Sequence, residues 1–273
     1  MCTYAAQEGY LGLLVWADSI GCKVSSATFR VACSNGHLEV LRYLFTAHPP
    51  ERKNHQGMFG TAMKHGHIHI LDYILGMSRL SEMQLGLLRS YETRLHLQYS
   101  REKIKTGICF TIAGYGDATA GGHLHVIVFL RDRGLMDYQK AVLCAGIAAR
   151  HGHSAILEYV WNEFSLAEKT VERGHHKMRQ VDILCEEAVT GNQMDILRWL
   201  VGKGANVPGT NVCAYACRVG SVDIIKYVCE TFRGSLTESV LVGMYMEAFN
   251  NGHSALCQWL NAAFPDVLAE VTA

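Results

Sequence analysis

The sequence has no excess of charge of either sign. Its 273 residues include 25 Lys plus Arg and 25 Asp plus Glu, so the formal net charge is zero with histidine neutral. Proteins that bind nucleic acid or anionic membranes usually carry a basic surplus, so this balance argues against both partner classes. Apolar residues make up 49% and charged residues 18% of the chain, which predicts a folded protein.

Other features are scarce or missing. Four prolines exclude a collagen-like or proline-rich linker architecture. The ten cysteines form no Cys-x-x-Cys pair, and the two closest, Cys213 and Cys217, have helical spacing. We therefore expect reduced, buried thiols and a cytoplasmic location. No apolar run approaches the ~18 residues of a membrane span. The short run at 10–17 follows the acidic Glu8, which argues against a signal peptide.

One pattern recurs along the chain: Ala-x-x-x-Gly-His-apolar-x-apolar-apolar-x-aromatic-apolar. We number each copy from its glycine, the anchor (position 0), so that the alanine is −4, the histidine +1 and the aromatic residue +7. The anchors of the eight copies are Gly9, Gly36, Gly66, Gly122, Gly152, Asn192, Gly220 and Gly252. The intervals are 27, 30, 56, 30, 40, 28 and 32 residues, and the interval of 56 leaves room for a degenerate copy. Such periods are typical of stacked supersecondary units.

Each repeated position has a mechanical reason. The anchor ends a first helix in the left-handed conformation, which glycine and sometimes asparagine adopt, and Asn192 is the one substitution observed. The alanine allows a neighbouring helix to approach closely. Apolar residues at +2, +4, +5 and +8 trace one face of an amphipathic second helix. We expect the aromatic residues at +7 to form a ladder in a core shared by stacked copies, because one unit cannot bury its own apolar face.

These residues resemble the ankyrin repeat, a pair of antiparallel helices with Ala-x-x-x-Gly-His between them. The turn Gly204-Ala205-Asn206-Val207 is similar to an ankyrin turn, and Gly21 and Gly134 also lie twelve residues after their anchors. The resemblance covers about residues 1–75 and 113–262. It implies an all-α, ankyrin-like helix-pair solenoid of about eight or nine repeats, forming a single domain over residues 1–273. In its aromatic residue at +7, the repeat is similar to that of ankyrin proteins from amoeba-infecting giant viruses and some protists. If this protein is viral, the resemblance implies that it is located in the host cytoplasm.

The sequence departs from the family in two ways. The Thr-Pro-Leu-His that opens an ordinary ankyrin first helix is absent from every copy, so we expect irregular starts to the first helices. Several intervals of 27–30 residues are shorter than the usual period of about 33. The repeats therefore predict short or missing finger hairpins.

Three segments interrupt the pattern. Residues 45–56 contain Pro49-Pro50 and predict a polar loop. Residues 76–112 predict an irregular insertion, either a degenerate repeat or an inserted helix, whose face is solvated or docks a partner. Residues 162–180 predict a long inter-repeat loop. Insertions in repeat arrays often serve binding. The tail, residues 261–273, is a candidate terminal cap.

Three motifs suggest chemistry that the repeat explains better. His65-x-His67-x-His69 resembles a metal site, but residues two apart point to different faces of a helix, and a turn would have to bring them together. Residues 108–116 resemble a strand entering a phosphate-binding Gly-x-Gly turn, but Thr119 stands where the third glycine belongs. Cys33 and His37 could suggest a cysteine protease, but the repeat explains why they are neighbours, since both belong to one copy. We expect no catalytic residue, metal or cofactor.

The sequence therefore predicts a non-enzymatic protein–protein interaction module. A rigid stack presents pre-placed side chains, so little ordering entropy is lost on binding. The ankyrin resemblance implies that the two residues before Gly-His line the concave face. The partner-binding positions implied are Ser34, Asn35, Lys64, His65, Arg150, His151, Thr190 and Arg218.

The basic residues Lys64, Arg150 and Arg218 favour an acidic partner segment. We expect a protein partner of unknown identity, and no nucleic acid, membrane or small-molecule substrate. Two alternatives remain. One is a substrate adaptor or an enzyme with its activity in the 76–112 insertion. The other is a structural, self-associating component.

Overall fold

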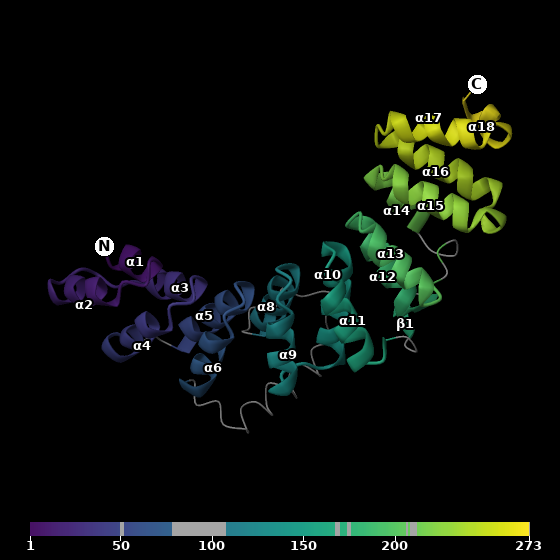
Figure 1. The fold of residues 1–273 in the computed structure, drawn as a ribbon. Helices are drawn as coiled ribbons and strands as arrows, with labels where there is room; N and C mark the ends of the chain where they lie inside the picture. Colours follow the sequence, from purple (N-terminus) through teal and green to yellow (C-terminus); the bar gives the residue numbers. More distant parts are fainter. Residues whose placement is uncertain are drawn as a thin grey trace. The chain divides into compact units, whose positions relative to one another are not determined.

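The computed structural model describes residues 1–49, 52–77, 108–166, 170–173, 176–205, 207 and 212–272. Within these residues the fold is all-α apart from one short hairpin, as the sequence predicts (Figure 1). Among the same residues, none of the helices has the length and apolar character needed to cross a membrane.

The helices follow one another in pairs. The first four pairs are α1 (Cys2–Gln7) with α2 (Leu11–Ser19), α3 (Ser26–Ser34) with α4 (Leu38–Ala47), α5 (Arg52–Lys64) with α6 (Ile68–Met77), and α8 (Ile108–Ala120) with α9 (Leu124–Asp132). The next four are α10 (Tyr138–His151) with α11 (Ser154–Glu163), α12 (Gln180–Thr190) with α13 (Met194–Gly202), α14 (Val212–Val219) with α15 (Val222–Thr231), and α16 (Glu238–Asn250) with α17 (Ser254–Ala263). The remaining elements are β1 (Thr170–Arg173), β2 (His176–Arg179), the short η3 (Arg233–Ser235) and α18 (Pro265–Thr272).

The two helices of every pair meet at the predicted anchor. All eight anchors have a positive φ, from 56° at Asn192 to 81° at Gly152, and each second helix begins two residues later. The backbone N–H at +1 donates to the carbonyl of the alanine at −4 in all eight copies, at 2.8–3.1 Å. This bond closes the left-handed C-terminal cap of a helix. The eight alanines are fully buried, at 0% exposure. The predicted joint is confirmed in every copy.

The chain divides into two compact units, residues Met1–Lys140 and Ala141–Ala273. In the first unit, α1, α3, α5 and α8 pack in sequence, each against the next, and α2 packs on α4 and α6 on α9 (Figure 1). The third and fourth copies are therefore in direct contact through α5 and α8. The choice between a degenerate repeat and an inserted helix concerns residues 78–107, which lie outside the described residues.

In the second unit, α12 packs on α14 and α14 on α16. The tail forms α18, which contacts both α16 and α17 and buries Leu268. The tail thus covers the last helix pair, in the manner of the expected terminal cap. The segment over 162–180 contains an antiparallel hairpin of β1 and β2, in which Val171 lies opposite Met178.

The second helices contribute a regular set of core residues, beside the buried residues of the first helices. The residues at +8 are buried in all eight copies, and those at +4 and +5 are buried except for the half-buried Leu13. The aromatic residues at +7 differ from the expected core ladder: seven are half-buried and Trp16 is 52% exposed. They lie at the edge between copies, where Tyr73 packs on Phe45 of the preceding copy with ring centroids 5.6 Å apart.

The described starts of the first helices differ in their caps: α1 and α12 have no side-chain cap hydrogen bond. Ser25 and Thr28 form a capping box at the start of α3, and Thr237 caps α16. The loop expected at 45–56 is shorter than predicted, because α4 continues to Ala47 and α5 already begins at Arg52. Side-chain caps are thus described for two of the first helices, and the irregular starts expected from the sequence stay a prediction.

Candidate functional site

In four copies the histidine at +1 bonds its copy to the preceding one. His37 Nε2 lies 2.8 Å from the carbonyl oxygen of Gln7, and His67 Nε2 lies 3.0 Å from that of Ser34. His123 and His253 make the same bond, each at 2.9 Å, to the carbonyls of Lys64 and Arg218. A carbonyl oxygen only accepts, so Nε2 carries the proton in each bond. The acceptor is always the residue at −2 of the preceding copy, so these bonds fix the spacing of the copies.

The same histidines give a second reason, besides the positive φ, for glycine at the anchor. A Cβ added to Gly36 would lie 2.8 Å from His67 Cε1, and one added to Gly220 would lie 2.5 Å from His253 Nδ1. Both distances are far below van der Waals contact. Glycine is therefore required for its positive φ and for the ring that packs against it.

The Asn192 joint shows how the exception is accommodated. Asn192 has a φ of 56°, and the next copy carries Ser221 in place of histidine. The Ser221 hydroxyl lies 2.5 Å from Asn192 Oδ1 and donates to it. The smaller serine leaves room for the asparagine side chain. The substitutions at the two positions compensate each other.

The predicted partner-binding residues lie at the C-terminal ends of first helices. Seven are exposed, and Ser34 is half-buried. Three of the short polar side chains bond to their own helix: Ser34 and Asn35 donate to the Val31 carbonyl, and Thr190 donates to that of Glu186. In the first unit, Ser34 and Asn35 on one copy are followed by Lys64 and His65 at the equivalent place on the next. They form a surface that continues from copy to copy.

Two of the three basic residues on this surface are paired within the chain. Arg150 Nε lies 2.8 Å from Glu187 Oε2, and an Arg218 terminal nitrogen lies 3.3 Å from Glu247 Oε1. In both pairs the arginine is at −2 and the glutamate at −5 of the next copy. Lys64 and Asp117 occupy the same two positions. The charge of both arginines is therefore accounted for by contacts between copies, and the argument for an acidic partner rests on Lys64.

A turn between α5 and α6 brings the histidine series at 65–69 together, which the sequence analysis named as the condition for their proximity. The ring centroids of His65 and His67 are 6.5 Å apart, and those of His67 and His69 are 5.7 Å apart, so neighbouring rings lie close together. The rings can approach one another because His65 and His67 precede α6, which begins at Ile68, and are therefore not held on opposite faces of a helix. His67 and His69 donate to carbonyls of the preceding copy, and burial lowers the pKa of His67. The described residues contain no group of three or more side chains able to hold a metal ion.

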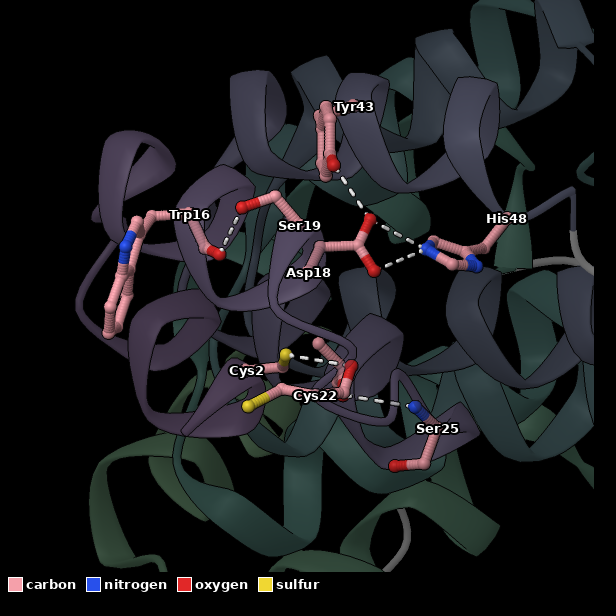
Figure 2. Close-up of polar contacts among 9 residues, drawn as sticks. Cys2, Trp16, Asp18, Ser19, Cys22, Ser25, Tyr43 and His48 are labelled. Atoms are coloured by element: carbon pink, nitrogen blue, oxygen red, sulfur yellow. Dashed lines mark hydrogen bonds and ion pairs between the residues drawn. The ribbon is translucent and has the colours of Figure 1, made fainter.

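A polar cluster joins the first two copies (Figure 2). Tyr43 Oη donates to the Asp18 carboxylate at 2.7 Å, and His48 Nε2 lies 2.8 Å from the same carboxylate. The hydrogen bonds from Tyr43 and then His48 lower the pKa of Asp18, and the bond to Asp18 raises the pKa of Tyr43. The sequence analysis did not single out these three residues. A comparison of the copies could have found them, since the first copy alone has a carboxylate at +9.

The cluster lacks the arrangement of a catalytic triad. The nearby thiol and hydroxyl both donate to main-chain carbonyls: Cys2 Sγ to that of Cys22 at 3.5 Å, and Ser19 Oγ to that of Trp16 at 2.7 Å (Figure 2). A nucleophile has to be hydrogen-bonded to its base, and His48 Nε2 is directed at Asp18. The geometry fits a clamp between copies.

The described cysteines are free thiols, and eight of the nine are buried. Burial raises the pKa of Cys33 and Cys185 to about 12, and that of Cys213 to about 11. The reactive form of cysteine is the thiolate, so these side chains are chemically inert at neutral pH. They fill the core, as the sequence predicts.

The stretch considered as a strand before a phosphate-binding turn is helical. Residues 108–116 lie inside α8, which runs from Ile108 to Ala120. The alternative of a strand entering a Gly-x-Gly turn is therefore wrong, and the helix is explained by the repeat, since Ala118 is its buried alanine at −4. Comparisons with known proteins add no identification: no family model matches the chain, and no curated protein matches its sequence significantly.

Proposed function

We propose that this chain is a non-enzymatic ankyrin-repeat protein that binds a partner protein. The ankyrin assignment is supported by the joint: a left-handed anchor, a buried alanine at −4 and a histidine at +1 that bonds the preceding copy. The anchor conformation and the buried alanine recur in all eight copies, and the histidine is present in five of them. They are the residues on which the resemblance rests.

The observation that carries the binding role is the repeated exposure at −2 and −1. In the first unit, Asn35, Lys64 and His65 are exposed at equivalent ends of α3 and α5. Their backbones are held by the bonds that His67 and His123 donate to the carbonyls of Ser34 and Lys64. Because this backbone is already held in place, binding costs little backbone ordering entropy, so a partner can be recognised through few contacts.

The chemistry of this surface is polar and mostly neutral. In the first unit it offers hydroxyl, amide and imidazole groups at Ser34, Asn35 and His65, next to the ammonium of Lys64. Such groups recognise a peptide by hydrogen bonds to its main chain and polar side chains. The partner expected is thus a protein segment rich in hydrogen-bond acceptors, and a strongly acidic one is not required.

A capture experiment with matched variants tests this proposal. The full chain is immobilised, partners from its native cell are identified by mass spectrometry, and their affinity is measured by calorimetry. The variant Asn35→Ala/Lys64→Ala/His65→Ala should weaken binding by about tenfold or more. The control Lys23→Ala/Arg30→Ala/Glu39→Ala changes exposed residues away from the −2 and −1 positions and should leave affinity nearly unchanged. The reverse ranking would refute the proposed surface.

The adaptor or enzyme alternative depends on the 76–112 insertion, most of which lies outside the described residues. Because α5 packs directly on α8, deletion of residues 78–107 with a short flexible linker should leave the stack folded. Unchanged circular dichroism and partner affinity would favour the repeat surface. Loss of binding, or of a turnover activity, from a folded deletion variant would assign the function to the insertion.

A further inference from the structure

Histidines gather where the second, third and fourth copies meet. The third and fourth copies both carry Gly-His-x-His, so that each has one histidine at +1 and another at +3. A further histidine precedes the anchor of the third copy. All of them belong to the first compact unit. We call this set the histidine cluster: His65, His67, His69, His123 and His125.

The rings of the cluster lie close together within each copy and between copies. The centroids of His123 and His125 are 5.7 Å apart, as are those of His67 and His69. A Cβ added to Gly66 would lie 3.0 Å from His123 Nδ1 and 3.1 Å from His125 Nε2. Both rings of the fourth copy therefore pack on the turn that carries the histidines of the third. Charges placed on these rings would act on one another.

The ring at +1 of the third copy is poorly placed to take a second proton. His67 Nε2 already donates to the Ser34 carbonyl, so an added proton goes to Nδ1. This nitrogen is packed on an anchor, since a Cβ added to Gly36 would lie 2.9 Å from it. A CH2 group accepts no hydrogen bond and keeps water away. The charged ring would therefore be poorly solvated on that side.

The electrostatics of His67 agree with this geometry. Burial is the main cause of its lowered pKa, and repulsion from His69, His65 and His123 adds to it. The bond to the Ser34 carbonyl favours the charged ring, but it is outweighed. The folded chain therefore takes up a proton at this position less readily than the unfolded chain does.

The charged groups around the cluster do not supply a surplus of carboxylates. On α5 and α8, which pack together, Lys64 and Asp117 carry opposite charges. On α4, Glu39 is paired with Arg42. The last turn of α3 and the first turns of α6 and α9 have no acidic side chain. In this described part of the chain, the charge gained on acidification would therefore come from the histidines themselves.

We propose that the histidine cluster makes the contacts among the second, third and fourth copies acid-sensitive. Proton uptake places positive charges on neighbouring rings, and it charges a ring whose Nδ1 is packed on glycine. Above the ordinary histidine pKa of about 6.5 the rings are neutral and the contacts hold. As the pH falls below that value, the unfolded chain binds more protons than the folded chain, so stability is lost until the folded rings are protonated too. This sensitivity needs no bound partner.

Urea denaturation of the full chain, followed by circular dichroism between about pH 8 and pH 5, tests the proposal. Over this range the unfolding equilibrium constant of the wild type should rise about tenfold or more. Carboxylates titrate mainly at lower pH, so they contribute little to the rise. Each variant is compared with itself at the two ends of the range, so a loss of stability that is independent of pH cancels.

Two matched variants separate the cluster from a single histidine. His67→Gln introduces at +1 the residue type that the sixth copy carries there, Gln193, and should reduce the rise to about threefold or less. His253→Gln is the control. It removes an equivalent bond, to the Arg218 carbonyl, and no other described histidine is shown in contact with His253. The control should keep the rise within about twofold of the wild type.

NMR titration of the histidine rings gives an independent check. In the wild type, His67 should titrate with a midpoint below about 6.5. The double variant His65→Gln/His69→Gln should raise that midpoint, because two repelling charges are removed. A wild-type midpoint at or above the ordinary value would overturn the proposal. So would a stability that is constant over this pH range, or a rise that His67→Gln reduces no more than His253→Gln does.

Discussion

The contact between the second and third copies and the contact between the sixth and seventh copies both pack an anchor residue against the +1 residue of the next copy, but with different side chains. The first uses Gly36 with the His67 ring packed against it, and the second uses Asn192 with the small Ser221. Both anchors have a positive φ, so the backbone is the same and the side chains differ. The comparison shows that two features restrict the anchor residue: the left-handed conformation at the end of its own helix, and the size of the +1 residue of the next copy.

The largest loss of stability is expected at an anchor glycine that has both a positive φ and a ring packed against it. Gly220→Ala and Gly252→Ala each place a Cβ in the left-handed region, which costs about 1–2 kcal/mol. At Gly220 the new Cβ would also displace His253 from the Arg218 carbonyl, whereas nothing lies within 4 Å of the Cβ position of Gly252. Urea denaturation should show a loss of about 3 kcal/mol for Gly220→Ala and about half of that for Gly252→Ala. Equal losses would mean that the ring contact is unimportant.

Transplanting the exceptional joint sharpens the same comparison. Gly36→Asn alone should destabilise the chain by about 2 kcal/mol, because the asparagine side chain collides with His67. His67→Ser alone removes the bond to the Ser34 carbonyl, at about 1 kcal/mol. The double variant recreates the pair seen at Asn192 and Ser221, so its loss should fall short of the sum by about 1 kcal/mol. A double-mutant cycle with strictly additive losses would contradict compensation.

The ion pairs between copies should contribute less. Arg150→Ala and Arg218→Ala break exposed pairs with Glu187 and Glu247, and each should reduce stability by about 0.5 kcal/mol at low salt. Screening should shrink both losses in high salt. Lys23→Ala, an exposed change with no ion pair shown, serves as the reference. A loss unaffected by salt would indicate a packing role for the arginine stems.

The smallest effect is expected at the Asp18 clamp, and it depends on pH. Tyr43 and His48 lower the pKa of Asp18 in the folded chain. A lowered folded pKa adds stability above the unfolded pKa of about 3.9, and this stability is lost as pH falls through the folded value. Asp18→Asn should therefore melt below the wild type at neutral pH, and the two Tm values should converge in acid. A difference that grows as the pH falls would contradict this assignment.

The joint could be predicted from sequence because its constraint is local. A left-handed residue at a helix end is usually glycine or asparagine, and each of the eight predicted positions holds one of the two with a positive φ. The partners of each copy could not be read from one copy, since they depend on how copies are aligned. The half-burial of Tyr73, which was expected in a core ladder, was mispredicted for this reason.

Part of the missing information was nevertheless present in the sequence. Each basic residue at −2, namely Lys64, Arg150 and Arg218, is followed by an acidic residue at −5 of the next copy. Comparing those two positions across copies would have predicted the pairs with Glu187 and Glu247. The hairpin of β1 and β2 and the Asp18 clamp carry no repeated signal, because each occurs at one place in the chain.

Amide hydrogen exchange measured by NMR tests the repeated joint most directly. The N–H at +1 bonds the alanine carbonyl in all eight copies, although it immediately follows an anchor at the turn between two helices. The account predicts slow exchange at the eight amides concerned, those of Tyr10, His37, His67, His123, His153, Gln193, Ser221 and His253. Exchange at the rate of an unfolded peptide at several of these amides, in a chain that is otherwise protected, would show that the copies do not share one joint.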